Sequence, residues 1–255
     1  MKNLKMIWQI KEVNKDLEGR LSKELGVSRI LSRILINRGI TTKRRGEKFL
    51  HPSLENLANP FLLAGMEKAV GRIIKAKEKG EKVLIYGDYD VDGITAVSLC
   101  LIILKELGLN TNFYIPERLK EGYGLHQEAI RLAREQGIGL IITVDCGITN
   151  RKEVRFAKSL GIDLIITDHH LPEEEQRPEA FAIIDPACNK ARVTPPPISG
   201  GFTPLEGVGP PDRGKGEEDF RELSGVGIVY KLMQALTKLP PSSILPLKGG
   251  GNRWG

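Results

Sequence analysis

Short apolar runs of strand type alternate with helical segments between residues 82 and 185, and this alternation restricts the chain to few folds. The first run is VLIYGD at 83–88, and the last is FAIID at 181–185. Strands that alternate with helices of about 10–15 residues form a parallel sheet with helices on both faces. Strands buried on both faces are continuous apolar runs, as these are. The sequence therefore predicts an α/β fold built on a parallel sheet.

The rest of the sequence predicts three further parts around this core, which spans residues 81–190. Residues 1–80 place apolar side chains at helical spacing and predict a small helical region before the sheet. Residues 191–223 are rich in proline and glycine and lack periodicity, which predicts a long loop or insert. Residues 224–255 begin with a helical pattern, SGVGIVYKLMQALTKL, and continue into a tail without a recognisable pattern.

Aspartates gather at the ends of the predicted strands. Ligands of open α/β sheets bind at the carboxyl ends of the strands, so a site there would be lined with carboxylates. A single aspartate after a strand is an ordinary turn or helix-cap residue. Four predicted strands ending in this way indicate a ligand site instead. The set comprises Asp88, Asp145, Asp168 and Asp185, joined by Asp90 and Asp92 of GDYDVDG.

Divalent metal ions are the natural partners of this acidic edge. Converging carboxylates raise one another's pKa unless cations neutralise them. The segments GDYDVDG, VDCGI and TDHH contain no lysine or arginine. Oxygen ligands suit Mg²⁺ or Mn²⁺, and the imidazoles of His169 and His170 favour Mn²⁺. We therefore expect two ions about 4 Å apart that activate a water molecule for attack on a phosphoester. Asp145, at the end of a central strand, is the expected bridging ligand.

Basic residues are concentrated in the first 50 positions. That segment holds 13 Lys/Arg against 5 Asp/Glu, a net charge of +8, whereas the remainder holds 25 against 27. A basic segment attracts polyanions such as nucleic acid. Solvated helices with outward lysines would give the same composition, so both interpretations stay open.

The chain lacks the short motifs of several other protein classes. GxxxxGK[ST] and GxSxG are absent, and the glycines after the first strand do not form GxGxxG; these motifs mark P-loops, hydrolase nucleophiles and dinucleotide folds. The three cysteines have no CxxC spacing, which favours a reducing, cytoplasmic location over disulfides or structural zinc. Neither a secretory signal nor a membrane span is expected.

Three ordered motifs, GDYDVDGITA, ITVDCGI and TDHH, resemble the first three motifs of the DHH phosphoesterases. YIPERLKEGYGL, HPSLENLANPFLLAGMEKAVGRI and SGVGIVYKLMQAL resemble the RecJ branch of that family, whose members are single-strand-specific 5′→3′ exonucleases. The resemblance covers residues 1 to about 190 and about 221–238. It implies metal-dependent hydrolysis of phosphodiester bonds in DNA repair and recombination. The implied partner is a single-stranded nucleic acid, expected to be DNA with a 5′ end, and the resemblance does not identify protein partners.

The resemblance also implies roles for individual residues. Asp168 would orient the site, and His170 would face the scissile phosphate, so both are expected to act in catalysis together with Asp145. Tyr86 stands where some members have a histidine. The implied metal ligands are Asp88, Asp90, Asp92, Asp145 and His169, with Asp145 bridging two ions. The residues implied along the DNA path are Arg118, Lys120 and Tyr123, for which a solvent-facing loop is the alternative.

The C-terminal part departs from the family pattern. The family's fourth motif resembles LGTxADVVPLxGENR and supplies a further aspartate, whereas this chain has SSILPLKGGGNRWG, with Ser243 near that position. The segment 192–222 is foreign to the pattern, and the printed sequence does not continue into the clamp domain that the pattern implies. We therefore expect a truncated or rearranged gene product, or a fragment of a longer protein. Two alternatives stay open, namely an inactive paralogue that retains metal or DNA binding, and a phosphoesterase of small substrates.

Overall fold

The computed structural model describes residues 11–171, 177–188, 220 and 223–238. The chain forms two compact units, Met1–Ala58 and Asn59–Gly255. In the described part of the first unit, the helical pattern of the sequence becomes three short helices and one 3₁₀ turn. Their bounds are α1 Lys15–Leu25, α2 Arg29–Asn37, α3 Lys43–Leu50 and η1 Leu54–Asn56.

Side-chain caps begin each of these short helices. Asn14, Ser28 and Thr42 accept hydrogen bonds from main-chain amides in the first turns of α1, α2 and α3. Such caps satisfy amides that a helix leaves unpaired at its start. The helices pack through the buried side chains of Leu21 and Leu35. Local signals in the sequence therefore account for where each helix starts.

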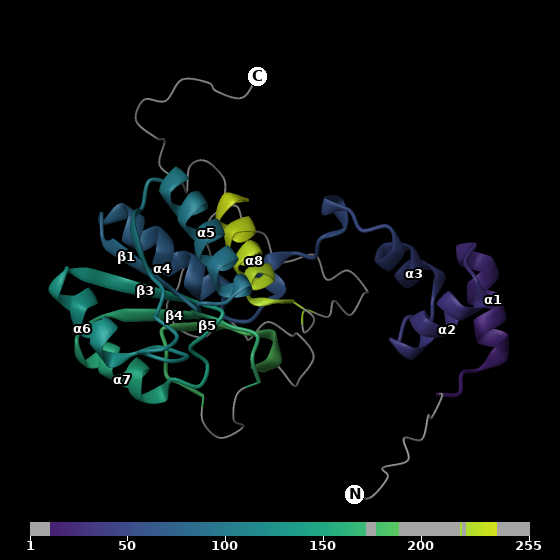
Figure 1. The fold of residues 1–255 in the computed structure, drawn as a ribbon. Helices are drawn as coiled ribbons and strands as arrows, with labels where there is room; N and C mark the ends of the chain where they lie inside the picture. Colours follow the sequence, from purple (N-terminus) through teal and green to yellow (C-terminus); the bar gives the residue numbers. More distant parts are fainter. Residues whose placement is uncertain (1–10, 172–176, 189–219, 221–222, 239–255) are drawn as a thin grey trace, which may run out of the picture. The chain divides into compact units, whose positions relative to one another are not determined.

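The second unit is built on a parallel sheet, as the sequence predicts (Figure 1). The described strands are ordered β2-β1-β3-β4-β5, and every neighbouring pair is parallel. β3 is therefore the middle strand, which confirms the central position expected for the strand that precedes Asp145. The bounds are β1 Lys82–Gly87, β2 Asn110–Tyr114, β3 Ile138–Val144, β4 Asp163–Thr167 and β5 Ala182–Ile184.

Helices cover both faces of this sheet (Figure 1). One face carries α4, α5 and α8, and the other carries α6 and α7. The continuous apolar strands fit this burial on both sides, because side chains of β1 alternate between the two layers. The bounds are α4 Met66–Glu78, α5 Val91–Glu106, α6 Gln127–Glu135, α7 Arg151–Ser159 and α8 Gly225–Thr237, with 3₁₀ turns η2 Pro60–Leu62 and η3 Pro186–Cys188.

Helix α4 packs within the second unit. Its cap residue Gly65 has φ 78°, and an added Cβ there would lie 2.1 Å from the carbonyl oxygen of Ile183 in β5. The sequence prediction grouped residues 1–80 as one helical region, whereas the compact units divide between Ala58 and Asn59. Most of the predicted insert 191–223 and the tail after Lys238 lie outside the described residues. No helix in the described part of the chain has the length and apolar character to cross a membrane.

Arg72 of α4 joins the amino ends of the strands. Its Nε lies 2.6 Å from Asp163 Oδ2, and its Nη2 lies 2.6 Å from Glu81 Oε2. The Arg72 side chain is only 5% exposed, although Asp163 and Glu81 are partly solvated. The guanidinium therefore links α4 to residues at the starts of β1 and β4, on the edge of the sheet opposite the strand-end aspartates.

Replacing Arg72 by methionine should lower the free energy of unfolding by about 2–3 kcal/mol, because two carboxylates lose a buried partner. Urea unfolding of the metal-free protein measures this loss. Arg131→Met is the matched control, since Arg131 forms an exposed pair with Glu128 on α6 and exposed pairs contribute about 0–1 kcal/mol. Equal losses in the two variants would contradict a stabilising role for Arg72.

Candidate metal centre

The four aspartates that follow β1, β3, β4 and β5 are all buried at the carboxyl end of the sheet. Their exposed fractions are 5%, 2%, 0% and 3% for Asp88, Asp145, Asp168 and Asp185. Burial raises the pKa of Asp88, and it raises the pKa of Asp185 to about 6. Carboxylates at such a place are costly to ionise unless donors or cations compensate them.

Asp145 is held in an unusual main-chain conformation. Among the described non-glycine residues, it alone has a positive φ, which is 61°. Its amide donates to the carbonyl of Thr167 at 2.9 Å, so the strand-end turn is fixed by β4. Non-glycine residues rarely adopt this conformation, although aspartate and asparagine tolerate it better than most, and it occurs often at functional sites. The fold thus holds this carboxylate in place at a cost in backbone strain.

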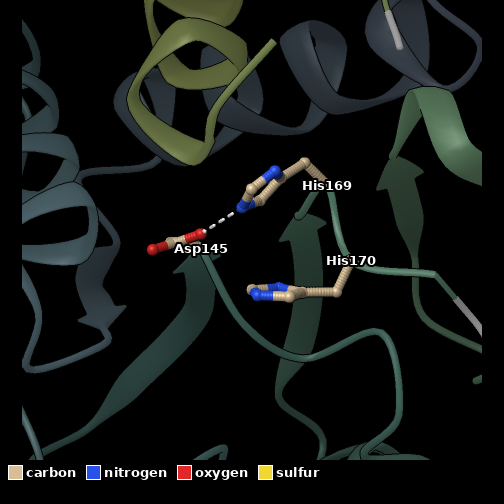
Figure 2. Close-up of side chains that lie close together, drawn as sticks. All are labelled: Asp145, His169 and His170. Carbon is tan, nitrogen blue, oxygen red and sulfur yellow. Dashed lines mark ion pairs between the residues drawn. The ribbon is translucent and has the colours of Figure 1, made fainter. Parts of the chain in front are cut away.

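Two groups of potential metal ligands share Asp145 among the described residues. In each group the ligand atoms lie within 4.8 Å of one another. His169 Nε2 lies 3.1 Å from Asp145 Oδ1, and the two side chains point toward each other (Figure 2). The groups are Asp145, His169 and His170, and Asp88, Asp90 and Asp145.

The donor atoms of these groups fit a divalent cation. Within the described residues, Asp88 Oδ1 and Asp145 Oδ1 are buried and accept no hydrogen bond, although Asp145 Oδ1 forms the 3.1 Å pair with His169 Nε2. Burial, followed by the nearby carboxylates of Asp92 and Asp90, raises the pKa of Asp145 to about 7. Unpaired carboxylate oxygens together with imidazole nitrogens form a ligand set for Mn²⁺ or Mg²⁺. A bound cation would reverse the penalty of ionising Asp145.

Both carboxylate oxygens of Asp168 accept hydrogen bonds from the protein itself. Its Oδ1 accepts from the amides of His169 and His170 at 2.8 and 3.1 Å, and its Oδ2 accepts from the amide of Ile148 at 3.0 Å. The same Oδ1 lies 2.7 Å from His170 Nδ1. This hydrogen bond raises the pKa of His170 to about 9. The geometry therefore suits Asp168 to orient His170, and Nε2 of that ring has no hydrogen-bond partner among the described residues.

Asp90 and Asp92 lie at the start of α5 and have different partners. Asp90 Oδ1 caps the helix by accepting from the amide of Gly93 at 2.9 Å. Both oxygens of Asp92 accept amides of α8, from Gly225 at 2.7 Å and Val226 at 2.8 Å. Asp92 belongs to neither ligand group, although its Oδ2 lies 3.8 Å from His169 Nε2.

The loop between β2 and α6 brings one of the three predicted substrate residues to the site. The hydroxyl of Tyr123 lies 3.2 Å from His170 Nδ1 and donates to the carbonyl of Asp145 at 3.3 Å. The buried phenol of Tyr86 supports this loop, because it donates to the carbonyl of Gly124 at 2.8 Å. Tyr86 therefore anchors the loop at the position where some family members have a histidine.

The other two predicted substrate residues lie on the same loop with different contacts. Arg118 stacks its guanidinium 5.3 Å from the ring centre of Tyr89. Lys120 is exposed and pairs with Glu117 at 2.7 Å. Their contact with DNA stays a prediction, as do the metal and catalytic roles of the residues described above. Ser243, expected near the fourth-motif position, lies outside the described residues.

Sequence reasoning missed the part that the start of α8 has in this site. The SGVG stretch predicted a helix, and its two glycines and capping serine were the available signals. They do not reveal a contact with Asp92, which is 133 residues from Gly225 in the chain.

The chain belongs to the DHH family, because the model of the DHH family N-terminal domain matches residues 82–247. It is homologous to exonucleases named RecJ, which confirms the resemblance found in its motifs. It is 38% identical over 247 residues to the single-stranded-DNA-specific exonuclease RecJ of Bacillus subtilis (strain 168), covering 97% of this chain and 28% of the relative. The corresponding protein of Escherichia coli (strain K12) is 38% identical over 208 residues, or 81% and 31% of the two chains.

Two solved structures support the same relationship. RecJ from Thermus thermophilus in complex with Mn²⁺ is 25% identical, with a TM-score of 0.61 over 91% of this chain and 29% of that one. An exonuclease RecJ bound to manganese is 30% identical, with a TM-score of 0.53 over 70% and 40% of the two chains. The present chain thus spans about three tenths of the length of the two curated relatives.

Replacing Asp145 by asparagine should stabilise the metal-free protein above pH 7. The pKa of Asp145 is about 7 in the folded state and about 4 in an unfolded chain, so the folded state binds more protons between these values. Its contribution to stability therefore falls as the pH rises through this window. The expected gain of Asp145→Asn at pH 8 is on the order of 2–4 kcal/mol. Asparagine, like aspartate, tolerates a positive φ such as the 61° at this position.

Urea unfolding in EDTA at pH 5 and pH 8 tests this expectation. The gain in the free energy of unfolding of the variant over the parent should be larger at pH 8 than at pH 5. Addition of Mn²⁺ should stabilise the parent more than the variant, since ligand binding to the native state raises its stability. A variant less stable than its parent at pH 8 would rule out a destabilising charge at position 145.

Proposed function

We propose that this chain hydrolyses phosphodiester bonds of single-stranded DNA with two bound ions, Mn²⁺ or Mg²⁺. The observation that carries the proposal is the buried carboxylate of Asp145, which belongs to both ligand groups and has an oxygen that accepts no hydrogen bond from the described residues. When bound, the ions would supply an activated water and neutralise charge on the phosphate. Membership of the DHH family and similarity to RecJ exonucleases support this choice of reaction and substrate.

The protein's own residues contribute positions and hydrogen bonds to this reaction. Asp145 holds one place in both groups because its main chain is fixed between β3 and β4. His170 keeps its Nδ1 on Asp168, so its Nε2 is available to donate to a phosphate oxygen. A donor oriented in advance toward developing charge contributes about 2.7–4 kcal/mol to catalysis. Tyr123 restrains the same imidazole through its hydroxyl.

We further propose that the chain acts from the 5′ end in DNA repair and recombination, and that it does so in the cytoplasm. The RecJ-like segments of the sequence, including YIPERLKEGYGL, support this direction. The three cysteines are buried and unpaired, which fits a reducing compartment. Arg118, Lys120 and Tyr123 are the proposed contacts along the strand.

Asp145→Asn should reduce nuclease activity at least 100-fold, because the ligand shared by both groups loses its charge. Degradation of a single strand labelled with ³²P at its 5′ end, in Mn²⁺, measures the rate. Immediate release of labelled mononucleotide would identify attack from the 5′ end, and the same strand labelled at its 3′ end should give a ladder of products. Asp16→Asn, which changes an exposed aspartate of α1, is the matched control.

The alternatives give different results in the same assay. A parent chain that binds Mn²⁺ but degrades no DNA would be a binding paralogue. A parent that cleaves a pentamer much faster than a long strand would be a phosphoesterase of small substrates. An Asp145→Asn variant with the parent's rate would exclude the two-ion site.

The positive charge of the first unit supports the proposal that the chain binds a polyanion. Residues 26–51, which contain α2 and α3, hold seven Lys/Arg and one Asp/Glu. Arg33 pairs with Glu18 and Lys43 pairs with Glu47. Arg44 and Arg45 are both exposed on α3. Exposed arginines on short helices are suited to contact phosphate groups.

Changing Arg44 and Arg45 together to glutamine should weaken binding of a single strand in EDTA. The salt dependence should also become shallower, because each phosphate contact contributes about 0.7 to the slope for single strands. Fluorescence anisotropy from 50 to 300 mM salt measures both effects. Arg131→Gln with Arg134→Gln, on α6, removes the same charge elsewhere and should change neither property by as much. Equal effects would assign the binding to net charge alone.

A further inference from the structure

The first turn of α8 lies against the acidic groups of the site. Both carboxylate oxygens of Asp92 accept main-chain amides of this turn, Oδ2 from Gly225 at 2.7 Å and Oδ1 from Val226 at 2.8 Å. These amides are among those that a helix leaves unpaired at its start, where the helix dipole favours negative charge. Asp92 itself lies in the first turn of α5. One carboxylate therefore ties the beginnings of two helices together.

Gly225 also lies directly against Asp145. A Cβ added to Gly225 would lie 2.5 Å from Asp145 Oδ1 and 2.6 Å from both Asp145 Cβ and Cγ. Asp145 cannot easily yield, because it is buried and its amide is bonded to Thr167. Gly225 does not adopt a positive φ, so the requirement for glycine comes from space and not from backbone conformation.

The rest of α8 is fixed in place, so its first turn is a rigid neighbour of the site. Ser224 caps the helix by accepting from the amide of Gly227. The helix packs against α5 and α4 and reaches β3 and β4. Buried apolar side chains extend along it, namely Ile228, Val229, Leu232, Met233, Ala235 and Leu236.

We propose that Gly225 and Val226 are positioning residues of the metal centre. Their amides set the orientation of Asp92 beside His169, and the missing side chain of Gly225 leaves the space that Asp145 occupies between the two ligand groups. Hydrogen-bonded groups around a metal site tune metal affinity without contact with the metal. Asp92 belongs to neither ligand group and would act in this way through His169, whose Nε2 lies 3.8 Å from Asp92 Oδ2. This inference rests on the proposed function, because it concerns the same metal centre.

The chain offers a matched pair of variants. Gly225→Ala and Gly227→Ala each add one methyl group to the first turn of α8 and each raise helix propensity by about 1 kcal/mol. At Gly227, the added Cβ would meet Leu223 side-chain atoms at 3.3 and 3.4 Å, which is far less severe than the contact at Gly225. Gly225→Ala should therefore lower Mn²⁺ affinity at least 10-fold, whereas Gly227→Ala should stay within about twofold of the parent.

Electron paramagnetic resonance of free Mn²⁺ during titration measures affinity and stoichiometry without any nuclease assay. Circular dichroism and the melting temperature in EDTA report whether each variant folds. A purely structural role would lower the melting temperature of Gly225→Ala but leave the Mn²⁺ affinity of the folded protein unchanged. That result would overturn the proposal.

A second variant decides the case in which Gly225→Ala does not fold. Val226→Pro removes one amide donor to Asp92 and adds no atom at position 225. Proline is tolerated in the first turn of a helix, and the preceding glycine lacks the Cβ that is one of the two groups a proline ring crowds. We expect a loss of Mn²⁺ affinity of at least threefold in the folded variant. An affinity equal to that of Gly227→Ala would reject the positioning role, whereas a parent that binds no Mn²⁺ would instead reject the proposed function.

Discussion

The crowding of buried carboxylates at the carboxyl end of the sheet is the constraint on which the rest of this structure depends. Charges of one sign in a buried place destabilise the fold unless donors or cations compensate them. Main-chain amides compensate Asp168, Asp90 and Asp92 in the described structure. Oδ1 of Asp88 and Oδ1 of Asp145 receive no such donor. The protein thus compensates part of the cluster with its own amides and leaves Oδ1 of Asp88 and Oδ1 of Asp145 available to a cation.

The amino and carboxyl ends of the sheet differ in how their carboxylates are compensated. At the amino end, Arg72 neutralises carboxylates beside the starts of β1 and β4. At the carboxyl end, Asp145 combines a strained main chain with a carboxylate whose pKa is raised to about 7 by burial and by neighbouring carboxylates. Functional sites commonly carry such local costs, which the surrounding fold offsets. Fixed strands and helices are needed to keep this carboxylate where a metal ion can use it.

Much of the fold and the position of the site could be predicted from local patterns. The runs VLIYGD and GLIITVD indicated buried strands, and the parallel sheet then required their terminal aspartates to lie along one edge. The neighbours of α4 could not be predicted, because a helical pattern does not specify which surface the helix packs against. The hydrogen bond between Asp92 and Gly225 could not be predicted either. Every residue other than proline has a main-chain amide, and these two residues come together only in the tertiary fold. The raised pKa of His170 likewise depends on the rotamer that brings its ring to Asp168.

The contact between Gly225 and Asp145 has a consequence for how this chain can evolve. A side chain at position 225 would displace Asp145 or require a smaller residue in its place, and no smaller residue carries a carboxylate. The two positions are therefore coupled, although they lie 80 residues apart in the printed sequence. In homologous chains that keep the carboxylate, we expect the glycine to be retained with it. In a lineage that lost the carboxylate, other residues could replace the glycine. Substitution at both positions would then indicate that the metal centre had been lost.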